Sequence, residues 1–279
     1  MANSFKYIGN SVGTPGTTPA TSLVLLQAQQ KLNENAAGMS PRYATVNPAA
    51  NAALIEGMKG LFNPVSAISK QFKSGLFGEG ILGYDELNMS QSVKQFTTGS
   101  RTGTITVSAS VTSEGATTIV LTGLGSTVIK AGDVFTVADC YAVNPQTRES
   151  TGSLYQFVAL ADVTASTTAS VTVPAMYSAS QALATVDALP VSGKSVTFLG
   201  SASTQYPQNL IYHKDAIAFA TADLLLPQGV DMASRQVHNG ISLRVVRQYD
   251  INNDRLPCRI DVLYGYSVIR PQMAVRLWG

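Results

Sequence analysis

Residues 209–221 read NLIYHKDAIAFAT, and residues 259–271 read RIDVLYGYSVIRP. The first stretch alternates around a polar corner, His213-Lys214-Asp215. The second is rich in β-branched and aromatic residues and stops at Arg270-Pro271. These patterns predict β-strands, so the C-terminal part of the chain is expected to be β-rich.

The chain has 279 residues, a formal net charge of +2 and only 13% charged residues. That charged fraction is about half of the usual one, and the charges do not form the basic patch of a nucleic-acid-binding protein. Sequence-specific binding of nucleic acid is therefore not expected. No apolar run approaches the ~20 residues that span a bilayer, and the N-terminus does not resemble a signal peptide. We expect a soluble protein, made in a cytoplasm, that does not act at a membrane.

The two cysteines, Cys140 and Cys258, lie far apart in the sequence. Two such residues do not make a disulfide framework. Free cysteine behaves as a small apolar residue, so both are predicted to be buried thiols in a reducing compartment.

Helix and strand signals are mixed in residues 1–98. An Asn or Thr directly before Pro is typical of a helix start, because Pro is tolerated in the first turn. The expected elements are a strand at 5–8, a helix from Thr18 to about residue 37, a strand at 43–46, helices that begin at Asn47-Pro48 and Asn63-Pro64, a glycine-rich loop at 75–83 and an extended segment at 84–89.

Residues 99–205 have a different texture, with Thr, Ser and apolar residues alternating and no helix of any length. Six short strands separated by turn residues predict a small antiparallel barrel or sandwich. They are expected near 105–111, 117–122, 134–140, 154–163, 170–173 and 195–199. The sequence pattern of residues 1–98 returns after residue 205. The simplest account is an α+β fold in three parts, 1–98, 99–205 and 206–279, with the middle part inserted as a β-domain.

Two long strands, at 241–250 and 257–269, are expected to pair through a turn at Asn252-Asn253. Period-two alternation places Ile260 and Val262 on one face and Arg259 and Asp261 on the other. The apolar face is expected to be buried. Leu263 breaks the alternation, which predicts a bulge or burial on both faces.

Four short motifs occur in a characteristic order: TVNP at 45–48, GYD at 83–85, KAGDVFTV at 130–137 and VNPQT at 143–147. Together with the two closing stretches quoted above, they resemble the major coat proteins of tailed bacteriophages of the P22 type. The resemblance covers essentially the whole chain.

The resemblance implies an HK97-like coat fold with axial and peripheral parts and an inserted antiparallel β-barrel domain. It implies a structural subunit of an icosahedral capsid that self-assembles into pentamers and hexamers around packaged DNA. The partners would be further copies of the chain, a scaffolding protein and a portal, and the location would be the virion capsid, after synthesis in the bacterial cytoplasm. The family's N-terminal arm, extended loop and spine helix would precede Met1, so this sequence is expected to lack them.

The resemblance also implies a contact between capsomers, made by a charged hairpin loop of the inserted domain. The matching place at 112–116 is short, so the longer loop at 142–153, with Arg148 and Glu149, is the better candidate. The alternative is a solvated surface turn.

No motif in the sequence predicts a catalytic residue, a cofactor or a metal site. Gly9-Asn10-Ser11-Val12-Gly13 matches G-x-S-x-G, but no helix start follows it, as a nucleophile elbow requires; a solvated loop is expected for Ser11. His213 and His238 have no ligands at metal spacing, and a zinc site needs three or four. The acidic stretch from Asp250 lacks the Gly and Glu of a calcium loop.

A different class of function is a β-rich module on a virion that binds a host or a carbohydrate through residues 99–205. Sugar binding favours exposed aromatic side chains. This region has no Trp and only three Tyr, Tyr141, Tyr155 and Tyr177, so the coat function is preferred. A hydrolase that uses Ser11 is disfavoured by the missing helix.

Overall fold

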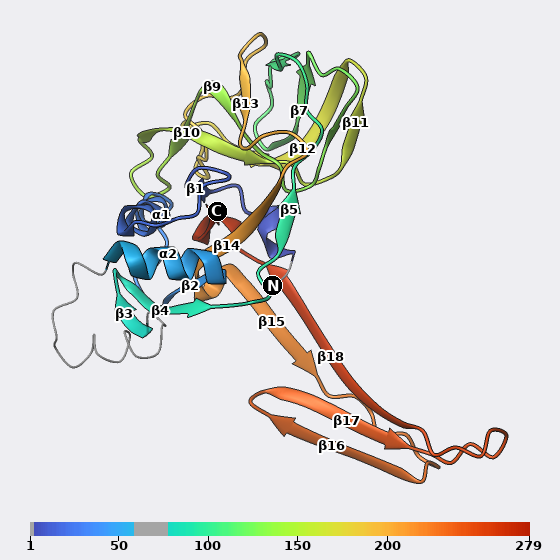
Figure 1. Ribbon diagram of the computed structural model, residues 1–279. Helices are drawn as coiled ribbons and strands as arrows, with labels where there is room; N and C mark the ends of the chain where they lie inside the picture. The colour runs from blue at the N-terminus through green and yellow to red at the C-terminus, as the bar shows by residue number, and fades with distance from the viewer. Residues whose placement is uncertain (1–2, 59–77) are drawn as a thin grey trace. The chain divides into compact units, whose positions relative to one another are not determined.

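The computed structural model describes residues 3–58 and 78–279. The fold is mixed α+β, rich in strands with few helices (Figure 1). It divides into two compact units, Met1–Ala216 together with Ile269–Gly279, and Ile217–Val268.

A seven-stranded sheet and two α-helices form one part of the first unit. The sheet order is β1-β19-β14-β2-β4-β3, and β5 pairs with β14. The bounds are η1 Ser4–Tyr7, β1 Ser11–Val12, α1 Ser22–Glu34, β2 Arg42–Val46, α2 Pro48–Met58, β3 Gly78–Ile81, β4 Tyr84–Met89, β5 Gln95–Thr97, β14 Gln205–His213, η3 Lys214–Ala216, η4 Pro271–Met273 and β19 Ala274–Trp278.

Local sequence explains the start of α2. Pro48 occupies the first helical position, and the Oδ1 atom of Asn47 accepts a hydrogen bond from the N–H of Ala50 at 3.0 Å. This is the cap expected from Asn-Pro. The backbone N–H of Asn47 donates to Oδ1 of Asn209 in β14 at 2.7 Å, which fixes the helix start to the sheet.

The first hydrophobic core lies between these helices and the sheet. Leu25, Ala28 and Leu32 of α1 are fully buried, at helical spacing. They pack with side chains of α2, β2, β4, β14 and β19, such as Leu54 and Ile211. No residue between 99 and 205 belongs to this core.

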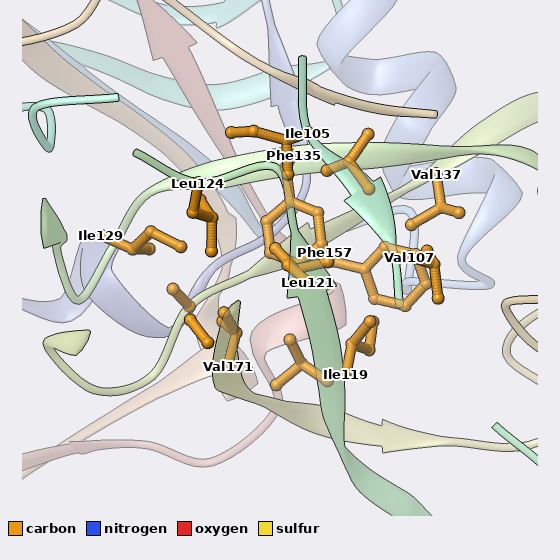
Figure 2. Packing of buried hydrophobic residues seen from close by; sticks show 14 of the residues in the cluster. Ile105, Val107, Ile119, Leu121, Leu124, Ile129, Phe135, Val137, Phe157 and Val171 are labelled. Atoms are coloured by element: carbon orange, nitrogen blue, oxygen red, sulfur yellow. The ribbon is translucent and has the colours of Figure 1, made fainter. Parts of the chain in front are cut away.

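A second core lies entirely within residues 105–198. Its strands are β6 Thr106–Val107, β7 Ala116–Thr122, β8 Thr127–Ile129, β9 Val134–Val143, β10 Ser150–Val158, β11 Val163–Ala165, β12 Thr168–Met176 and β13 Val196–Phe198. They form small antiparallel sheets, β10-β9-β13, β11-β8 and β12-β7-β6. Figure 2 shows the rings of Phe135 and Phe157 among aliphatic side chains, and these rings stack with centroids 5.6 Å apart.

The chain leaves the first sheet and returns to it at adjacent positions. Thr97 of β5 lies opposite Gln205 of β14 in an antiparallel pair. Just beyond, the hydroxyl of Thr98 donates to the carbonyl of Ser201 at 2.6 Å, and its N–H donates to the carbonyl of Thr204 at 3.0 Å. Residues 99–205 therefore begin and end side by side.

The second unit is one four-stranded antiparallel sheet in the order β15-β18-β17-β16. Its strands are β15 Ile217–Ala222, β16 Met232–His238, β17 Ile241–Arg247 and β18 Cys258–Val268. The β16–β17 hairpin turns at Asn239 and Gly240, with φ of 49° and 77°. A two-residue turn with both φ values positive favours Asn-Gly, because its twist matches that of the strands.

Several expected elements are confirmed, and the polar corner at 213–215 is one of them. β14 ends at His213, η3 turns the chain, and β15 follows. The strand at 43–46, the extended segment at 84–89 and the pairing of β17 with β18 are also as expected.

Other expectations are wrong. Residues 4–7 form a 3-10 helix instead of a strand, because the N–H groups of Lys6 and Ile8 bond to the carbonyls of Asn3 and Phe5. The helix expected from Thr18 begins only at Ser22. Residues 78–81 of the expected glycine-rich loop form β3, which pairs with β4. The helix expected after Asn63-Pro64 lies outside the described residues.

The expected burial of Ile260 and Val262 is also wrong. The alternation is correct, because Val262 lies opposite Leu243 and Asp261 opposite Arg244 in the β17–β18 pair. However, Ile260 is 68% exposed and Val262 is 42% exposed. No register shift interrupts this pair or the β15–β18 pair, so Leu263 does not mark a bulge.

Candidate assembly surfaces

The predicted contact residues, Arg148 and Glu149, lie at the tip of the β9–β10 hairpin. Val143 pairs with Ser150, and Asn144 organises the turn between them. Its Oδ1 atom accepts from the N–H of Gln146 at 2.8 Å, and its carbonyl accepts from the N–H of Arg148 at 2.8 Å. Asn is favoured at such a position because its side chain can bond the backbone two residues on.

Both charged side chains at this tip are exposed. Arg148 has a positive φ of 59°, which suits the end of a tight turn. Within residues 3–58 and 78–279, neither Arg148 nor Glu149 has an ion-pair partner. The loop therefore presents one cation and one anion side by side, both available to a neighbouring molecule.

A buried carboxylate, Asp133, holds the start of the 99–205 region. Its oxygens accept from Nη1 of Arg101 at 2.6 Å, from the N–H of Gly99 at 3.1 Å and from the N–H of Lys130 at 2.9 Å. The side chain of Asp133 is 0% exposed and that of Arg101 5%. The ion pair thus ties the first residues of this region to the turn between β8 and β9.

Arg276 of β19 connects the same turn to the seven-stranded sheet. It is fully buried, and its Nη1 donates to the carbonyl of Gly132 at 2.6 Å. Its Nε donates to Oε1 of Gln208 at 2.8 Å. The guanidinium lies over the rings of Phe5, Phe96 and Trp278, at 5.4, 5.5 and 4.8 Å from their centroids. Burial lowers the pKa of this guanidinium, and the charge of Asp133 partly opposes that shift.

A second connection is made by Gln156 of β10. Its Oε1 accepts from the N–H of Ser11 at 2.7 Å, and its Nε2 donates to the carbonyl of Ser11 at 3.0 Å. Nζ of Lys31 in α1 also donates to this Oε1, at 3.1 Å. One amide side chain thus joins the 99–205 region to both β1 and α1.

Ser11 is not the solvated loop residue expected from the sequence. It is 3% exposed and lies in β1, which pairs in parallel with β19. Its hydroxyl has no hydrogen-bond partner among the described residues. The helix that a nucleophile elbow needs does not follow directly, because α1 begins only at Ser22.

The remaining sequence candidates do not assemble into a metal site. Nδ1 of His213 lies 3.6 Å from Oδ2 of Asp215 at the polar corner. His238 is the last residue of β16, in the other unit. In the part of the chain that the structure describes, no group of three His, Cys, Asp or Glu side chains could hold a metal ion. No described helix has the length and apolar character to cross a membrane.

The two thiols differ, although both were expected to be buried. Cys140 is 1% exposed, its Sγ donates to the carbonyl of Ala188 at 3.1 Å, and burial raises its pKa to about 12. Cys258 is exposed at the start of β18. The sequence does not distinguish them, because exposure of β18 depends on what covers the sheet.

Sequence reasoning missed an exposed apolar surface, one face of the sheet of the second unit. Its apolar residues recur at every second position of β17 and β18, such as Leu243, Ile260, Val262 and Tyr264. Alternation is the available signal, but it does not distinguish a buried apolar face from an exposed one. Each of these four side chains is at least 40% exposed.

A protein-family model described as "P22 coat protein - gene protein 5" matches residues 25–279 of this chain. A curated relative, the "Major capsid protein" of Acyrthosiphon pisum secondary endosymbiont phage 1, is 23% identical over 289 residues. The alignment covers 96% of this chain and 68% of that protein.

Two solved structures show weaker similarity. A chain from Mycobacterium phage Che8 aligns with a TM-score of 0.38 and 10% identity, over 99% of this chain and 55% of that one. The present chain thus spans just over half of that protein's length. The CUS-3 coat protein I-domain aligns with a TM-score of 0.28 and 24% identity, over 36% of this chain and 98% of that domain.

Proposed function

This chain belongs to the P22 coat protein family and is a structural subunit of a bacteriophage capsid. We propose that it self-assembles into pentamers and hexamers. These capsomers form an icosahedral shell around packaged DNA. The observation that carries the proposal is the match of the coat-protein model to residues 25–279, which span most of the first compact unit and all of the second.

The proposed fold is HK97-like, with residues 99–205 as an inserted antiparallel β-barrel domain between 1–98 and 206–279. Two observations support the insertion. The core at 105–198 shares no residue with the first core. The two ends of the region are adjacent, because β5 pairs with β14.

Residues 99–205 produced as a separate fragment are expected to fold cooperatively. Their core is self-contained, although the fragment loses the bonds of Gly132 and Gln156 to the rest of the chain. Circular dichroism should show a β-rich spectrum and one thermal transition. A helical spectrum, or no transition, would count against the inserted domain.

The partners proposed for the assembled protein are further copies of the chain, a scaffolding protein and a portal. The proposed location is the virion capsid, after synthesis in the cytoplasm of the bacterial host. A weakly charged surface suits this work, because many weak contacts must form and re-form while a shell assembles.

Sedimentation velocity combined with light scattering tests self-assembly on the purified chain. We expect large particles to appear as the protein concentration rises, in equilibrium with small oligomers. A single monomeric species at every concentration would contradict the proposal.

We further propose that the β9–β10 loop contacts a neighbouring capsomer through Arg148 and Glu149. Replacing Arg148 with Glu should lower the yield of particles and their resistance to salt. An exposed ion pair contributes only ~0–1 kcal/mol, but a shell repeats each contact many times. The melting temperature of the unassembled subunit should stay unchanged, because Arg148 has no ion-pair partner in the described part of its own chain.

The matched control exchanges both charges, Arg148→Glu with Glu149→Arg, and so preserves the net charge of the loop. If the position of each charge matters, this double variant should also assemble poorly. Particles of Arg148→Glu with the yield and salt resistance of the unmodified protein would mean that the loop is only a solvated turn.

A further inference from the structure

A cavity of about 350 Å³ lies within the first unit. Its wall combines residues of the 99–205 region with residues from near both ends of the chain. Tyr155 of β10 and Tyr177, just after β12, come from that region, whereas Tyr7 of η1 and Gln272 of η4 come from outside it. Small-molecule sites typically occupy about 300–1,000 Å³ and often lie where two parts of a protein meet. The cavity therefore has the size and the setting of a site for one small molecule.

The chemistry of the wall is uncharged. Within residues 3–58 and 78–279, no Asp, Glu, Lys, Arg or His lines the cavity. Most of the wall is aromatic or aliphatic, and the remainder is amide and hydroxyl groups. A phosphate, carboxylate or ammonium group would lose hydration here without gaining an opposite charge, which is costly. The wall therefore selects against nucleotides, sugar phosphates and other charged ligands.

Two amide side chains of the wall leave hydrogen-bond acceptors unused. Nδ2 of Asn10 donates to the carbonyls of Gln272 and Ala274, at 3.1 and 3.3 Å. Nδ2 of Asn35 donates to the carbonyl of Lys31 at 2.8 Å. A carbonyl can only accept, so each NH2 group faces the chain and each Oδ1 atom is left over. Neither Oδ1 has a hydrogen-bond partner among the described residues. A ligand that donates several hydrogen bonds would satisfy both.

The tyrosine rings supply the second part of the chemistry. Tyr7 is 51% exposed, and Tyr155 and Tyr177 are partly exposed. The ring of Tyr155 is held edge-on by Phe157, with centroids 4.7 Å apart, so its orientation is fixed before any ligand arrives. Burial raises the pKa of Tyr155 to about 12, which keeps its hydroxyl protonated at neutral pH. An aromatic ring has a negative face that attracts weakly positive C–H groups.

We propose that this cavity binds an uncharged sugar. A pyranose ring carries C–H groups that fit a tyrosine face, and several hydroxyls that can donate to Oδ1 of Asn10 and of Asn35 together. A purely apolar molecule would leave both amide oxygens without a donor. A proline-rich peptide also favours an aromatic groove, but its prolines have no N–H to donate. The inference adds a binding function to the coat role and does not depend on self-assembly.

Saturation-transfer NMR on the full, unassembled chain tests the site. The probes are the methyl glycosides of glucose, galactose and mannose, and N-acetylglucosamine. At least one should bind, with a dissociation constant on the order of 1 mM, as suits a ligand of so few atoms. The 6-phosphate of that sugar and cyclohexylmethanol are the control probes. The first adds charge and the second keeps a ring with a single hydroxyl, so both should bind about fivefold more weakly or not at all.

Two tyrosines of equal exposure provide the matched variants. Tyr7 and Tyr249 are each 51% exposed, but only Tyr7 lines the cavity, and Tyr249 lies in the second unit. Tyr7→Leu should weaken binding of the sugar about fivefold through the lost ring contact, whereas Tyr249→Leu should bind it as the unmodified chain does. Tyr155→Phe keeps the ring beside Phe157 and removes only the hydroxyl, which should also weaken binding about fivefold.

A free sugar and the end of a surface glycan share this chemistry. Retention of the chain on beads that display the bound sugar at polysaccharide ends would identify a glycan as the source, and binding in solution alone would identify a free sugar. Either result supports the site. No saturation transfer to any of the four neutral sugars, equally tight binding of cyclohexylmethanol, or unmodified affinity in both Tyr7→Leu and Tyr155→Phe would overturn it.

Discussion

Replacing Asp133 with Ala is expected to lower the free energy of unfolding by about 3–5 kcal/mol. The carboxylate is fully buried and accepts hydrogen bonds from Arg101, Gly99 and Lys130. Its removal leaves the guanidinium of Arg101, 5% exposed, as an uncompensated buried charge. Two backbone N–H groups also lose their acceptor. Urea denaturation of the unassembled subunit measures the loss.

Asp162 supplies the matched control for Asp133. It also accepts an N–H of the same turn, from Ala131 at 2.7 Å, but it is exposed. Asp162→Ala should therefore lower stability by less than about 1 kcal/mol, because water can replace the lost acceptor. Equal losses for the two variants, or no loss for Asp133→Ala, would contradict the role assigned to the buried pair.

Replacing Arg276 with Ala is expected to lower the free energy of unfolding by about 3–5 kcal/mol, as for other large side chains removed from a core. The change empties the space between Phe5, Phe96 and Trp278. It also removes the donors to Gly132 and Gln208. Thermal unfolding of the unassembled subunit should show a clear drop in melting temperature.

The variant Arg276→Met separates the contribution of packing from the contribution of charge to the stability that Arg276 provides. Met keeps much of the volume and removes a guanidinium whose pKa burial has lowered, a sign that the charge is poorly solvated there. Replacing a buried charged group with a well-packed apolar one is often neutral, so Met should restore at least half of the stability lost in Arg276→Ala. If Arg276→Ala has the melting temperature of the unmodified protein, the packing of Arg276 among Phe5, Phe96 and Trp278 does not stabilise the fold.

Elements set by local chemistry could be predicted from the sequence. The Asn-Pro start of α2, the Asn-Gly turn between β16 and β17, and the strands of 99–205 each depend on a few neighbouring residues. The strand expected at 5–8 is wrong, because a 3-10 turn and a strand have similar signals over so few residues.

The residues that join distant segments of the chain, Asp133, Gln156 and Arg276, could not be identified in the same way. Arg276 and Gly132 are 144 residues apart in the chain, and Gln156 and Ser11 are 145 apart. Single-sequence patterns carry no information on such distant contacts. Nothing in the residues around Ser11 signals that a distant amide forms hydrogen bonds with its backbone.

The exposed apolar side of β17 and β18 shows a different limit of prediction from sequence. Alternation in β18 correctly separates Ile260 and Val262 from Arg259 and Asp261. It does not say whether the same chain or another molecule covers the apolar side. For a coat subunit this distinction matters, because part of its surface is buried only when other subunits surround it in the shell.

Cryo-electron microscopy of the assembled particles tests the central claim, that this chain is the repeating subunit of a capsid shell. We expect icosahedral particles in which density for this chain recurs in pentamers and hexamers, with residues 99–205 resolved as a separate lobe of each subunit. Particles without a shell lattice, or a discrete small oligomer as the end state of assembly, would contradict the account.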